Sequence, residues 1–402
     1  MFNVNSFSIS RLPKIEFGPG TINKLPSIIK TYGNRLLIVT GDKSFIQSES
    51  WADLEKNLSS SDIEYTLCHV ITEPSPTLID KLVQDYRLSA VDAVVAIGGG
   101  SALDAGKAIA GLLKTSYSVM DFLEGVGPEL VYEGPVVPFI AVPTTAGTGS
   151  EATKNAVLSE QSFNGYKKSF RDEKLVPAVA IVDPDLLKSC PESLIAANGM
   201  DALTQLMESY VSTHSNEMTD ALAISGIKAI KASLLAWYDG DNSDTNRSKM
   251  AYASLLSGIN LAQTGLGSVH GLASPLGAFF PIPHGMVCGT LLAEAADINI
   301  TAMKQREPDN PALFKYAELG RLLSDNISLN DEAAHQSLIF VLRQLVEQMD
   351  LPYLKEYGIR VEHLEHIVGH SRGSSMKTNP IVLTDDEIRQ LVFRRIKRQA
   401  ND

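Results

Sequence analysis

The sequence predicts an N-terminal α/β domain with a mostly parallel sheet, followed by an all-helical domain. In the first half, short β-branched runs alternate with amphipathic stretches, a spacing typical of βαβ units. From Gly199 onward, helical periodicity continues almost everywhere and no convincing strand is found. The length of 402 residues exceeds that of most single hydrophobic cores, so more than one domain is expected. Pro184 and Pro191 bracket the transition, which assigns residues 1–190 to the α/β domain and 191–402 to the helical domain.

The predicted strands lack polar alternation, as the run AVVAI illustrates, so helices should cover both faces of the sheet. Helices are expected between strands at Phe45–Leu58 and Leu78–Leu88. Thr384 and Glu387 have the spacing of a capping box that opens the last helix. The strands themselves are expected at residues 36–40, 63–70, 92–97, 136–142 and 179–182.

Composition excludes several classes of protein. The chain has 35 Lys and Arg against 47 Asp and Glu, a net charge of −12, so nucleic acid and anionic membranes would repel it. Cys68, Cys190 and Cys288 lie far apart without a CxxC pair, which suggests neither a disulfide framework nor a thiolate metal site. No signal-peptide core and no apolar window of about 18 residues are found. We expect a cytoplasmic protein with no membrane partner.

A strand, a glycine turn and a helix follow one another in VDAVVAIGGGSALDAGKAIAGLL. Gly98, Gly99 and Gly100 allow a close approach of the backbone, and Ser101 can cap the helix. The free N–H groups at the start of that helix suit a pyrophosphate. The pattern differs from GxGxxG because Leu103 occupies the third glycine position, and a tight turn with glycines for steric reasons is the alternative.

A second loop strengthens the hypothesis of a dinucleotide site. The strand VVPFIAV runs into PTTAGTGSEAT, where Thr144 and Thr145 can bind phosphate or ribose. A hydroxyl-rich capping loop would have the same composition. After the first of the predicted strands, Gly41 stands at the tip and Asp42 follows, so these residues leave open whether the ribose carries a 2′-phosphate.

The helical half contains a candidate metal site. Asp201 and Gln205 are four residues apart, hence on one face of a helix. His270 and His284 stand in an apolar, glycine-rich segment, where buried imidazoles need partners that a divalent ion could supply. The alternative is structural: a helix cap, a core amide and two satisfied core histidines.

A second group of histidines competes with this site. His363, His366 and His370 have the spacing i, i+3, i+7, which places them on one face of a helix. A solvated or interface face is the simpler interpretation of this group.

Together, five stretches of the chain resemble the iron-containing (group III) alcohol dehydrogenase family. The resemblance implies a Rossmann-like parallel-sheet nucleotide-binding domain and a dehydroquinate synthase-like all-helical metal-binding domain. It further implies NAD(P) in the cleft between them, a divalent iron or zinc ion, and commonly a homodimer. The matching stretches are AIGGGSALDAGKAIA, VPTTAGTGSEAT, VAIVDP, NGMDALTQLMESY and GLGSVHGLASPLGAFFPIPHG.

The resemblance also assigns cofactor-binding residues. Gly41 occupies a place where NAD-using members carry an aspartate, which favours NADP, and Asp42 stands beside it. The other residues that match cofactor positions are Gly98, Gly99, Gly100, Ser101, Asp104, Thr144, Thr145, Gly149 and, more loosely, Lys168.

The family's metal ligands are an Asp, a His one turn later, and two His fourteen residues apart. Asp201, His270 and His284 match this pattern with the correct spacing, whereas Gln205 stands in place of the second ligand. An amide oxygen is a poorer donor than imidazole, so we expect Gln205 to be a weak or water-bridged ligand. Ser274 replaces a histidine that in many members is thought to relay protons.

The leading hypothesis is an NAD(P)-dependent, metal-assisted alcohol dehydrogenase or aldehyde reductase acting on a small alcohol or carbonyl compound. Asp201, His270 and His284 would hold the ion that polarises the substrate oxygen. One alternative is a metal-independent reductase of an oxo-acid, as in maleylacetate reductase relatives, with Arg171, Lys168 or Lys377 binding the carboxylate. Another is a nucleotide-binding protein that has lost catalysis.

Overall fold

A six-stranded, wholly parallel sheet forms the centre of the first half of the chain in the computed structural model, which describes residues 6–397. The strand order is β1-β8-β5-β4-β2-β3. The central strand β4 is buried at all six positions, which explains why its sequence shows no polar alternation. The strands are β1 (Lys14–Phe17), β2 (Arg35–Thr40), β3 (Glu64–His69), β4 (Ala93–Gly98), β5 (Phe139–Pro143) and β8 (Val179–Val182).

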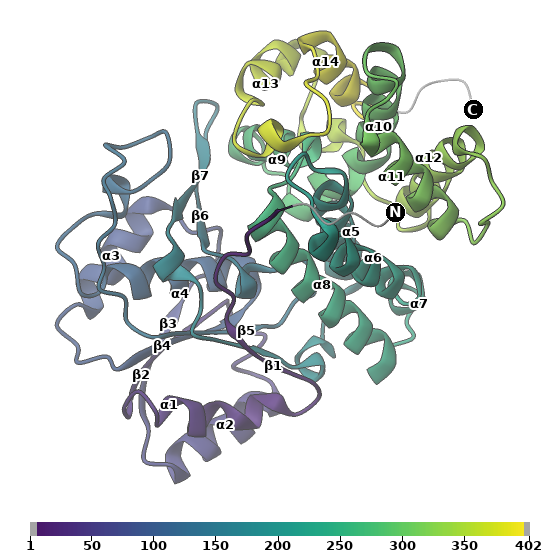
Figure 1. Ribbon diagram of the computed structural model, residues 1–402. Coiled ribbons are helices and arrows are strands. Elements are labelled where there is room, and N and C mark those ends of the chain that lie inside the picture. The colour runs from purple at the N-terminus through teal and green to yellow at the C-terminus, as the bar shows by residue number, and fades with distance from the viewer. Residues whose placement is uncertain (1–5, 398–402) are drawn as a thin grey trace.

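Helices cover both faces of this sheet, as predicted (Figure 1). α1 (Leu25–Ile29) and α2 (Glu49–Ser60) pack their apolar side chains on one face. α3 (Pro76–Tyr86) and α4 (Gly100–Leu112) pack on the other face. Each face therefore has its own layer of core residues, and the expected βαβ organisation is confirmed.

Three differences from the predicted strands are found. The edge strand β1, which pairs with β8, was not predicted. The other two differences have local causes. The strand expected from residue 136 begins at Phe139, directly after Pro138, which has no N–H to donate to a neighbouring strand. An antiparallel hairpin of β6 (Asn155–Glu160) and β7 (Tyr166–Arg171) was not predicted. The half-buried YKKSFR of β7 carries too many charges to read as a strand.

The second half is helical, and no strand occurs in residues 183–397. Thr384 caps α14 through the predicted capping box with Glu387. The α-helices of this half are α5 (Glu192–Val211), α6 (Glu217–Lys231), α7 (Leu234–Tyr238), α8 (Asp244–Thr264), α9 (Ser268–Phe279), α10 (His284–Arg306), α11 (Pro311–Leu323), α12 (Asp331–Gln348), α13 (Leu364–His370) and α14 (Asp385–Phe393).

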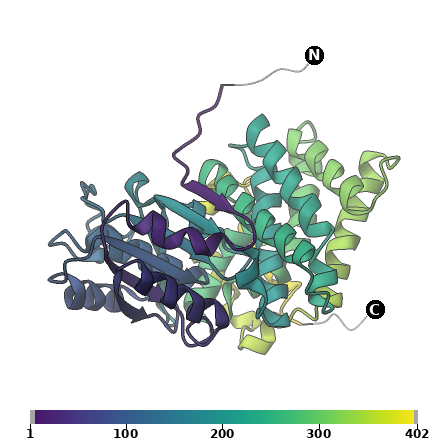
Figure 2. The same cartoon turned by 90° about the horizontal axis from the view of Figure 1, so that it is seen from below.

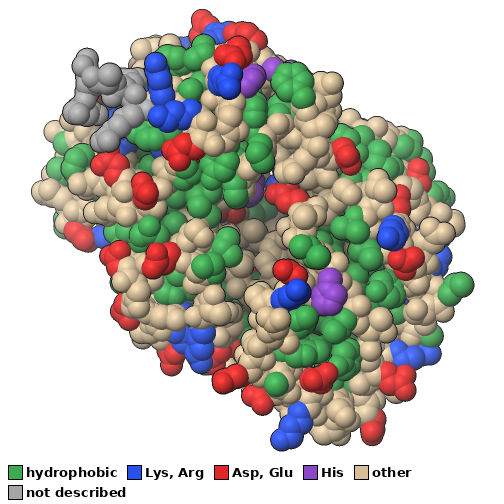
Figure 3. Space-filling model, turned by 180° about the vertical axis from the view of Figure 1, so that it is seen from behind, with side chains coloured by type: hydrophobic (Ala, Val, Ile, Leu, Met, Phe, Trp, Pro, Cys, Tyr) green, Lys and Arg blue, Asp and Glu red, His purple; other side chains and the backbone are tan. Residues whose placement is uncertain are grey.

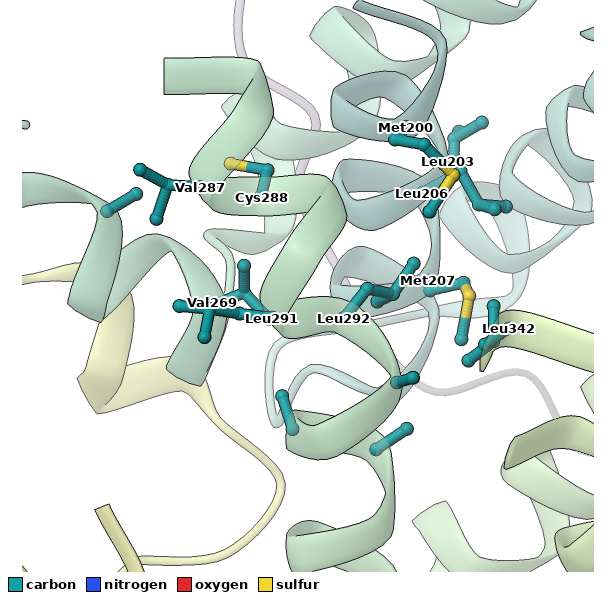
Figure 4. Close-up of a cluster of buried hydrophobic side chains, with 14 of the residues drawn as sticks. Met200, Leu203, Leu206, Met207, Val269, Val287, Cys288, Leu291, Leu292 and Leu342 are labelled. Carbon is teal, nitrogen blue, oxygen red and sulfur yellow. The ribbon is translucent and has the colours of Figure 1, made fainter. Parts of the chain in front are cut away.

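Helices α5 and α10 lie at the centre of the helical half. Figure 4 shows Leu203 and Leu206 of α5 and Leu291 and Leu292 of α10 among the buried side chains of this core. By length and composition alone, α10 could cross a membrane. Most of the helix is buried inside the fold, which is the usual position of the apolar core helix of a globular protein.

The two halves lie side by side, with the sheet at one end and the helical bundle at the other (Figure 2). The β6–β7 hairpin connects them, because Ser162 N donates to the carbonyl of Ala278 in α9 at 3.1 Å. The hydroxyl of Ser274 donates to the carbonyl of Lys167 at 3.0 Å. The hairpin thus fixes α9 relative to the sheet.

Candidate active site

The glycine turn and the second loop follow neighbouring strands and lie against each other. Gly98 is paired with Pro143 at the ends of β4 and β5, and Thr144 N donates to the carbonyl of Gly98 at 3.0 Å. A Cβ atom on Gly100 would lie 2.8 Å from the Cγ2 atom of Thr148. The lack of a side chain at Gly100 therefore allows the two loops to meet.

Helix α4 begins at the glycine turn with an uncapped end. Its N-cap residue is Gly99, and no side chain accepts a hydrogen bond from its first turn. The expectation that Ser101 caps this helix is therefore wrong, because Ser101 lies inside the first turn. Backbone N–H groups without intrahelical partners remain at the carboxyl edge of the sheet, which is the arrangement that binds phosphate.

Two residues matched to cofactor positions have partners within the protein. The carboxylate of Asp104 accepts a hydrogen bond from Ser150 Oγ at 2.6 Å, inside the protein. Gly149 has a φ of +62°, and a Cβ atom there would lie 2.3 Å from the Cα of Gly258 in α8. Both residues hold the second loop in place.

At the tip of β2, Gly41 is adjacent to the glycine turn, and Asp42 is exposed to solvent. The ring of His69, at the end of β3, lies beside this tip. Its Nδ1 atom is 3.0 Å from Thr40 Oγ1 and 3.3 Å from the carbonyl oxygen of Gly41. The tip of β2 is therefore formed by Gly41 and the neighbouring His69, and no carboxylate stands at position 41.

On the helical side, four potential ligand atoms converge. They belong to Asp201 of α5, His270 of α9, and His284 and Cys288 of α10, and all lie within 4.8 Å of one another. Asp201 Oδ1 is 3.3 Å from His270 Nε2 and 3.8 Å from His284 Nε2. Cys288 Sγ is 3.6 Å from His270 Nε2 and 3.7 Å from His284 Nε2.

The carboxylate of Asp201 is 1% exposed, and neither of its oxygens accepts a hydrogen bond in the described structure. A buried carboxylate without such partners is costly, and a bound cation would remove that cost. These donors, two imidazoles and a carboxylate among them, fit a divalent transition-metal ion.

Glu208 orients His270 from behind. Its Oε2 atom is 2.6 Å from His270 Nδ1, and its Oε1 accepts from Val269 N at 2.7 Å. With Nδ1 held by Glu208, Nε2 faces Asp201 and Cys288 and is the atom that would bind an ion. Such a carboxylate behind a histidine is a common arrangement at metal sites. Glu208 was not predicted, although it lies two helical turns after Asp201.

The pKa values in this group depend on burial and on neighbouring charges. Burial disfavours ionisation of Asp201, but His284 and His270 outweigh it and lower the pKa of the carboxyl. Burial lowers the pKa of His284 to about 4, so its imidazole is neutral and able to bind a metal. Burial raises the pKa of the Cys288 thiol to about 12 in the ion-free protein.

Gln205 has other partners than this group. Its Oε1 accepts a hydrogen bond from Ser257 Oγ at 2.6 Å, and its Nε2 donates to the carbonyl of Thr148 at 3.5 Å. Gln205 as a weak or water-bridged ligand therefore stays a prediction. The Gln205 amide connects α5 to α8 and to the second loop, and its oxygen is engaged by a hydroxyl.

Lys167, rather than Lys168, extends toward the metal-ligand group. The Lys167 Nζ atom is 2.7 Å from Glu73 Oε1, and its charge acts on His284. Lys168 alternates to the other face of β7, where its Nζ atom lies close to Gly125. The period-two alternation of the hairpin, which was not predicted, decides which of the two lysines faces the site.

The three C-terminal histidines lie outside the metal-ligand group, against the tip of the hairpin and the end of α9. The ring of His366 stacks on Phe163 at 4.6 Å, and its Nε2 atom is 3.1 Å from the Phe163 carbonyl oxygen. His370 contacts Phe279, and His363 contacts Phe280. These histidines thus pack at an interface between the C-terminal segment, the hairpin and α9, which agrees with the simpler interpretation of a solvated or interface face.

The surface is hollowed between the two halves. Figure 3 shows this hollow from behind, with histidine and acidic side chains inside it. The glycine turn and second loop come from one half and the metal-ligand group from the other. This arrangement can hold a phosphate-containing cofactor and a cation on opposite walls of one cleft.

Comparison with known proteins identifies the family. Residues 13–184 match the family model "Iron-containing alcohol dehydrogenase", and residues 195–396 match "Fe-containing alcohol dehydrogenase family, C-terminal". The chain belongs to the iron-containing alcohol dehydrogenase family. The resemblance seen in the sequence is confirmed.

Relatives of the chain within the iron-containing alcohol dehydrogenases are enzymes. Alcohol dehydrogenase 4 of Saccharomyces cerevisiae is 32% identical over 396 residues, which cover 96% of this chain and 97% of the relative. Lactaldehyde reductase of Escherichia coli is 30% identical over 353 residues, 87% of this chain and 88% of the relative. The solved structure of a 1,3-propanediol oxidoreductase, 28% identical, has a TM-score of 0.87 and covers 97% of this chain and 100% of its own.

The predicted fold class and enzyme class are therefore both confirmed. As a member of the iron-containing alcohol dehydrogenases, the chain is an oxidoreductase that acts on CH–OH groups of small alcohols or on the corresponding aldehydes. Family membership implies NAD(P) and an iron or other divalent ion as cofactors.

Proposed function

We propose that this chain is an NADP(H)-dependent, metal-assisted alcohol dehydrogenase that reduces short aldehydes in the cell. The observation that carries the proposal is the buried Asp201 carboxylate, which has no hydrogen-bond partner and faces two imidazoles across from the glycine turn. Bound NADP(H) would supply or accept the hydride, and a bound divalent ion would polarise the substrate oxygen.

The residues of the α/β half would bind the cofactor. The free N–H groups at the start of α4, from Gly100 onward, would hold the pyrophosphate. The hydroxyls of Thr144 and Thr145 stand at the next strand end, where they can contact phosphate or ribose. Asp104 and Gly149 would support these contacts by fixing the second loop.

The preference for NADP over NAD is supported by the corner at Gly41. Gly41 has no carboxylate that would repel a 2′-phosphate, and the neighbouring ring of His69, whose Nδ1 atom is 3.3 Å from the Gly41 carbonyl oxygen, carries no negative charge. Gly41→Asp introduces a carboxylate at the tip of the strand. We expect kcat/KM for NADPH to fall and that for NADH to rise, and an unchanged NADPH preference would contradict this assignment.

The residues of the helical half would hold the ion and the substrate oxygen. Asp201, His270 and His284 are the expected ligands, and Glu208 keeps His270 in the tautomer whose Nε2 faces the ion. The lysine–glutamate pair of Lys167 and Glu73 forms a charged part of the wall near His284. The names of the relatives, lactaldehyde reductase and 1,3-propanediol oxidoreductase, support small oxygenated substrates.

A metal-independent oxo-acid reductase is less well supported. Such an enzyme needs free cationic groups in the cleft for the carboxylate of its substrate. Arg171 is paired with Glu124 at 3.3 Å, and Lys168 lies near Gly125. Lys377 is exposed on a short helical turn.

The first experiment is elemental analysis of protein purified without chelator or nickel. Oxidation of NADPH and NADH is followed with short aldehydes before and after treatment with EDTA. We expect about one ion per chain, and activity that is lost to EDTA and restored by metal. EDTA-resistant turnover without metal would favour the oxo-acid reductase, and NADPH binding without turnover would favour the protein that has lost catalysis.

We also propose that the chain works as a homodimer in the cytoplasm. The family resemblance supports the dimer, and the acidic composition supports the location. Size-exclusion chromatography with light scattering tests the dimer, because a monomeric mass at micromolar concentration would contradict it.

A further inference from the structure

We propose that Cys288 is the fourth ligand of the metal site, where it replaces the imidazole that is missing at Gln205. The inference deepens the proposed metal-assisted function and rests on it. It assigns to the ion one thiolate sulfur, two imidazole nitrogens and one carboxylate oxygen. Zinc is the ion that this set of ligands favours, since thiolates bind zinc well.

The distances between the four donor atoms agree with a tetrahedral site. Bonds of about 2.0–2.3 Å to a central ion place neighbouring ligands roughly 3.3–3.8 Å apart. The contacts of Asp201 Oδ1 with the two Nε2 atoms are 3.3 and 3.8 Å, and those of Cys288 Sγ are 3.6 and 3.7 Å. Four of the six edges of the tetrahedron thus have the expected length, and the other two are no longer than 4.8 Å.

The sequence places the sulfur correctly through helix geometry. Cys288 follows His284 by four residues in α10, so both side chains project from the same face one turn apart. Asp201 and Gln205 have the same relationship in α5, and only Asp201 takes part. In this assignment the fourth ligand is the residue one turn after His284 in α10, and not the residue one turn after Asp201 in α5.

Gln205 and Cys288 differ in what their side chains face. The Gln205 oxygen accepts a hydrogen bond of 2.6 Å from Ser257, which holds the amide toward α8. Cys288 is fully buried, and its sulfur lies against the Nε2 atoms of both histidines. A cysteine that served only as a small apolar core residue would place its sulfur among carbon atoms.

Figure 4 shows Cys288 beside Val287 on α10, in the cluster of buried apolar side chains. Cys288 therefore stands where the apolar core meets the group of ligands. When the ion binds, the thiol loses its proton to solvent and a sulfur–metal bond forms. The low exposure protects the thiolate from the oxidation that affects exposed cysteines.

Cobalt(II) is the probe for this assignment, because thiolate-to-cobalt charge transfer gives a near-ultraviolet absorption band that oxygen and nitrogen ligands do not. The metal-free full chain is titrated with cobalt, and bound cobalt and absorption are measured together. We expect one cobalt per chain with the sulfur band. The band should vanish in Cys288→Ser and persist in the matched controls Cys68→Ser and Cys190→Ser.

A second variant keeps the test decisive if Cys288→Ser binds no metal. The double variant Cys288→Ser/Gln205→His restores an imidazole at the family's position. We expect it to bind cobalt again without the sulfur band. Zinc affinity should fall in Cys288→Ser by at least the roughly 10–100-fold that the loss of an outer hydrogen-bond partner costs.

Two results would overturn the assignment. Cobalt bound to the unaltered chain without a sulfur band would exclude Cys288 while leaving the metal-assisted function intact. The same conclusion would follow if the band persisted in Cys288→Ser. If the unaltered chain bound no cobalt or zinc at all, both the ligand assignment and the metal-assisted function would fail.

Discussion

Glu208 and His270 form the shortest contact of the candidate metal centre, 2.6 Å between the carboxylate Oε2 and the imidazole Nδ1. The contact joins α5 to the first turn of α9, where Glu208 also accepts from Val269 N. One buried carboxylate thus fixes both the position of α9 and the tautomer of a ligand.

Glu208→Gln should therefore weaken metal binding. An amide neither holds the Nδ1 proton as firmly nor supplies negative charge behind the imidazole, so we expect zinc affinity to fall roughly 10–100-fold. Competition with a fluorescent chelator measures this. Glu192→Gln, an exposed position in the first turn of the same helix, is the matched control. Equal zinc affinities in the two variants would show that Glu208 does not support the ligand.

Gly100→Ala should weaken cofactor binding. The new methyl group would lie 2.8 Å from Thr148 Cγ2, which forces the second loop away from the glycine turn. Overpacking of this kind costs about 1–3 kcal/mol, and 1.4 kcal/mol is tenfold in affinity. We expect the Kd for NADPH to rise about tenfold, as measured by quenching of protein fluorescence. Gly369→Ala, where the new methyl group meets open space, should leave the Kd unchanged.

Five of the six strands of the sheet, its two covered faces and the helical second half could be predicted because they depend on local patterns. AVVAI has no polar residue to expose, and the helical periodicity after Gly199 is regular. The β6–β7 hairpin could not be predicted in the same way. Its strands are stabilised by packing on α4 and α9, which no local pattern of YKKSFR reveals.

In the candidate site, too, some residues could be predicted from the sequence and others could not. Asp201, His270 and His284 could be identified from family spacing, because that pattern is written in the sequence. Cys288 could not, since cysteine spacing was compared only with cysteines, whereas its partners are histidines on two helices. A pairing of His284 with the residue one helical turn later is the signal that would have found it.

Lys107 is fully buried and should be needed for folding of the α/β half. Its Nζ atom lies 2.6 Å from the Asn155 carbonyl oxygen and 2.9 Å from that of Ser150. Lys107→Met removes the donor to these carbonyls and the cation that lies 3.9 Å from the Asp104 carboxylate, so we expect a loss of about 3–5 kcal/mol in the free energy of unfolding. Urea unfolding followed by fluorescence measures the loss. Lys114→Met, at an exposed position, should change it by no more than about 0.5 kcal/mol.

Glu151 should make stability depend on pH in a defined direction. Burial raises the pKa of this carboxyl from 4.5 to about 7, and its Oε1 atom has no hydrogen-bond partner. The folded protein therefore favours the protonated form. The contribution of Glu151 is fully present below the unfolded pKa of 4.5 and is lost as pH rises through about 7.

Comparison with Glu151→Gln isolates this contribution, because glutamine cannot ionise. The free energy of unfolding of the unaltered chain, relative to the variant, should fall by on the order of 3 kcal/mol between about pH 4.5 and pH 7.5. Lys107 is the neighbouring cation, and its pKa, lowered by burial to about 8, leaves it mostly charged over this interval. Glu160→Gln, at an exposed position of β6, is the control. A difference between the unaltered chain and Glu151→Gln that stayed constant across the interval would show that Glu151 is already ionised in the folded protein.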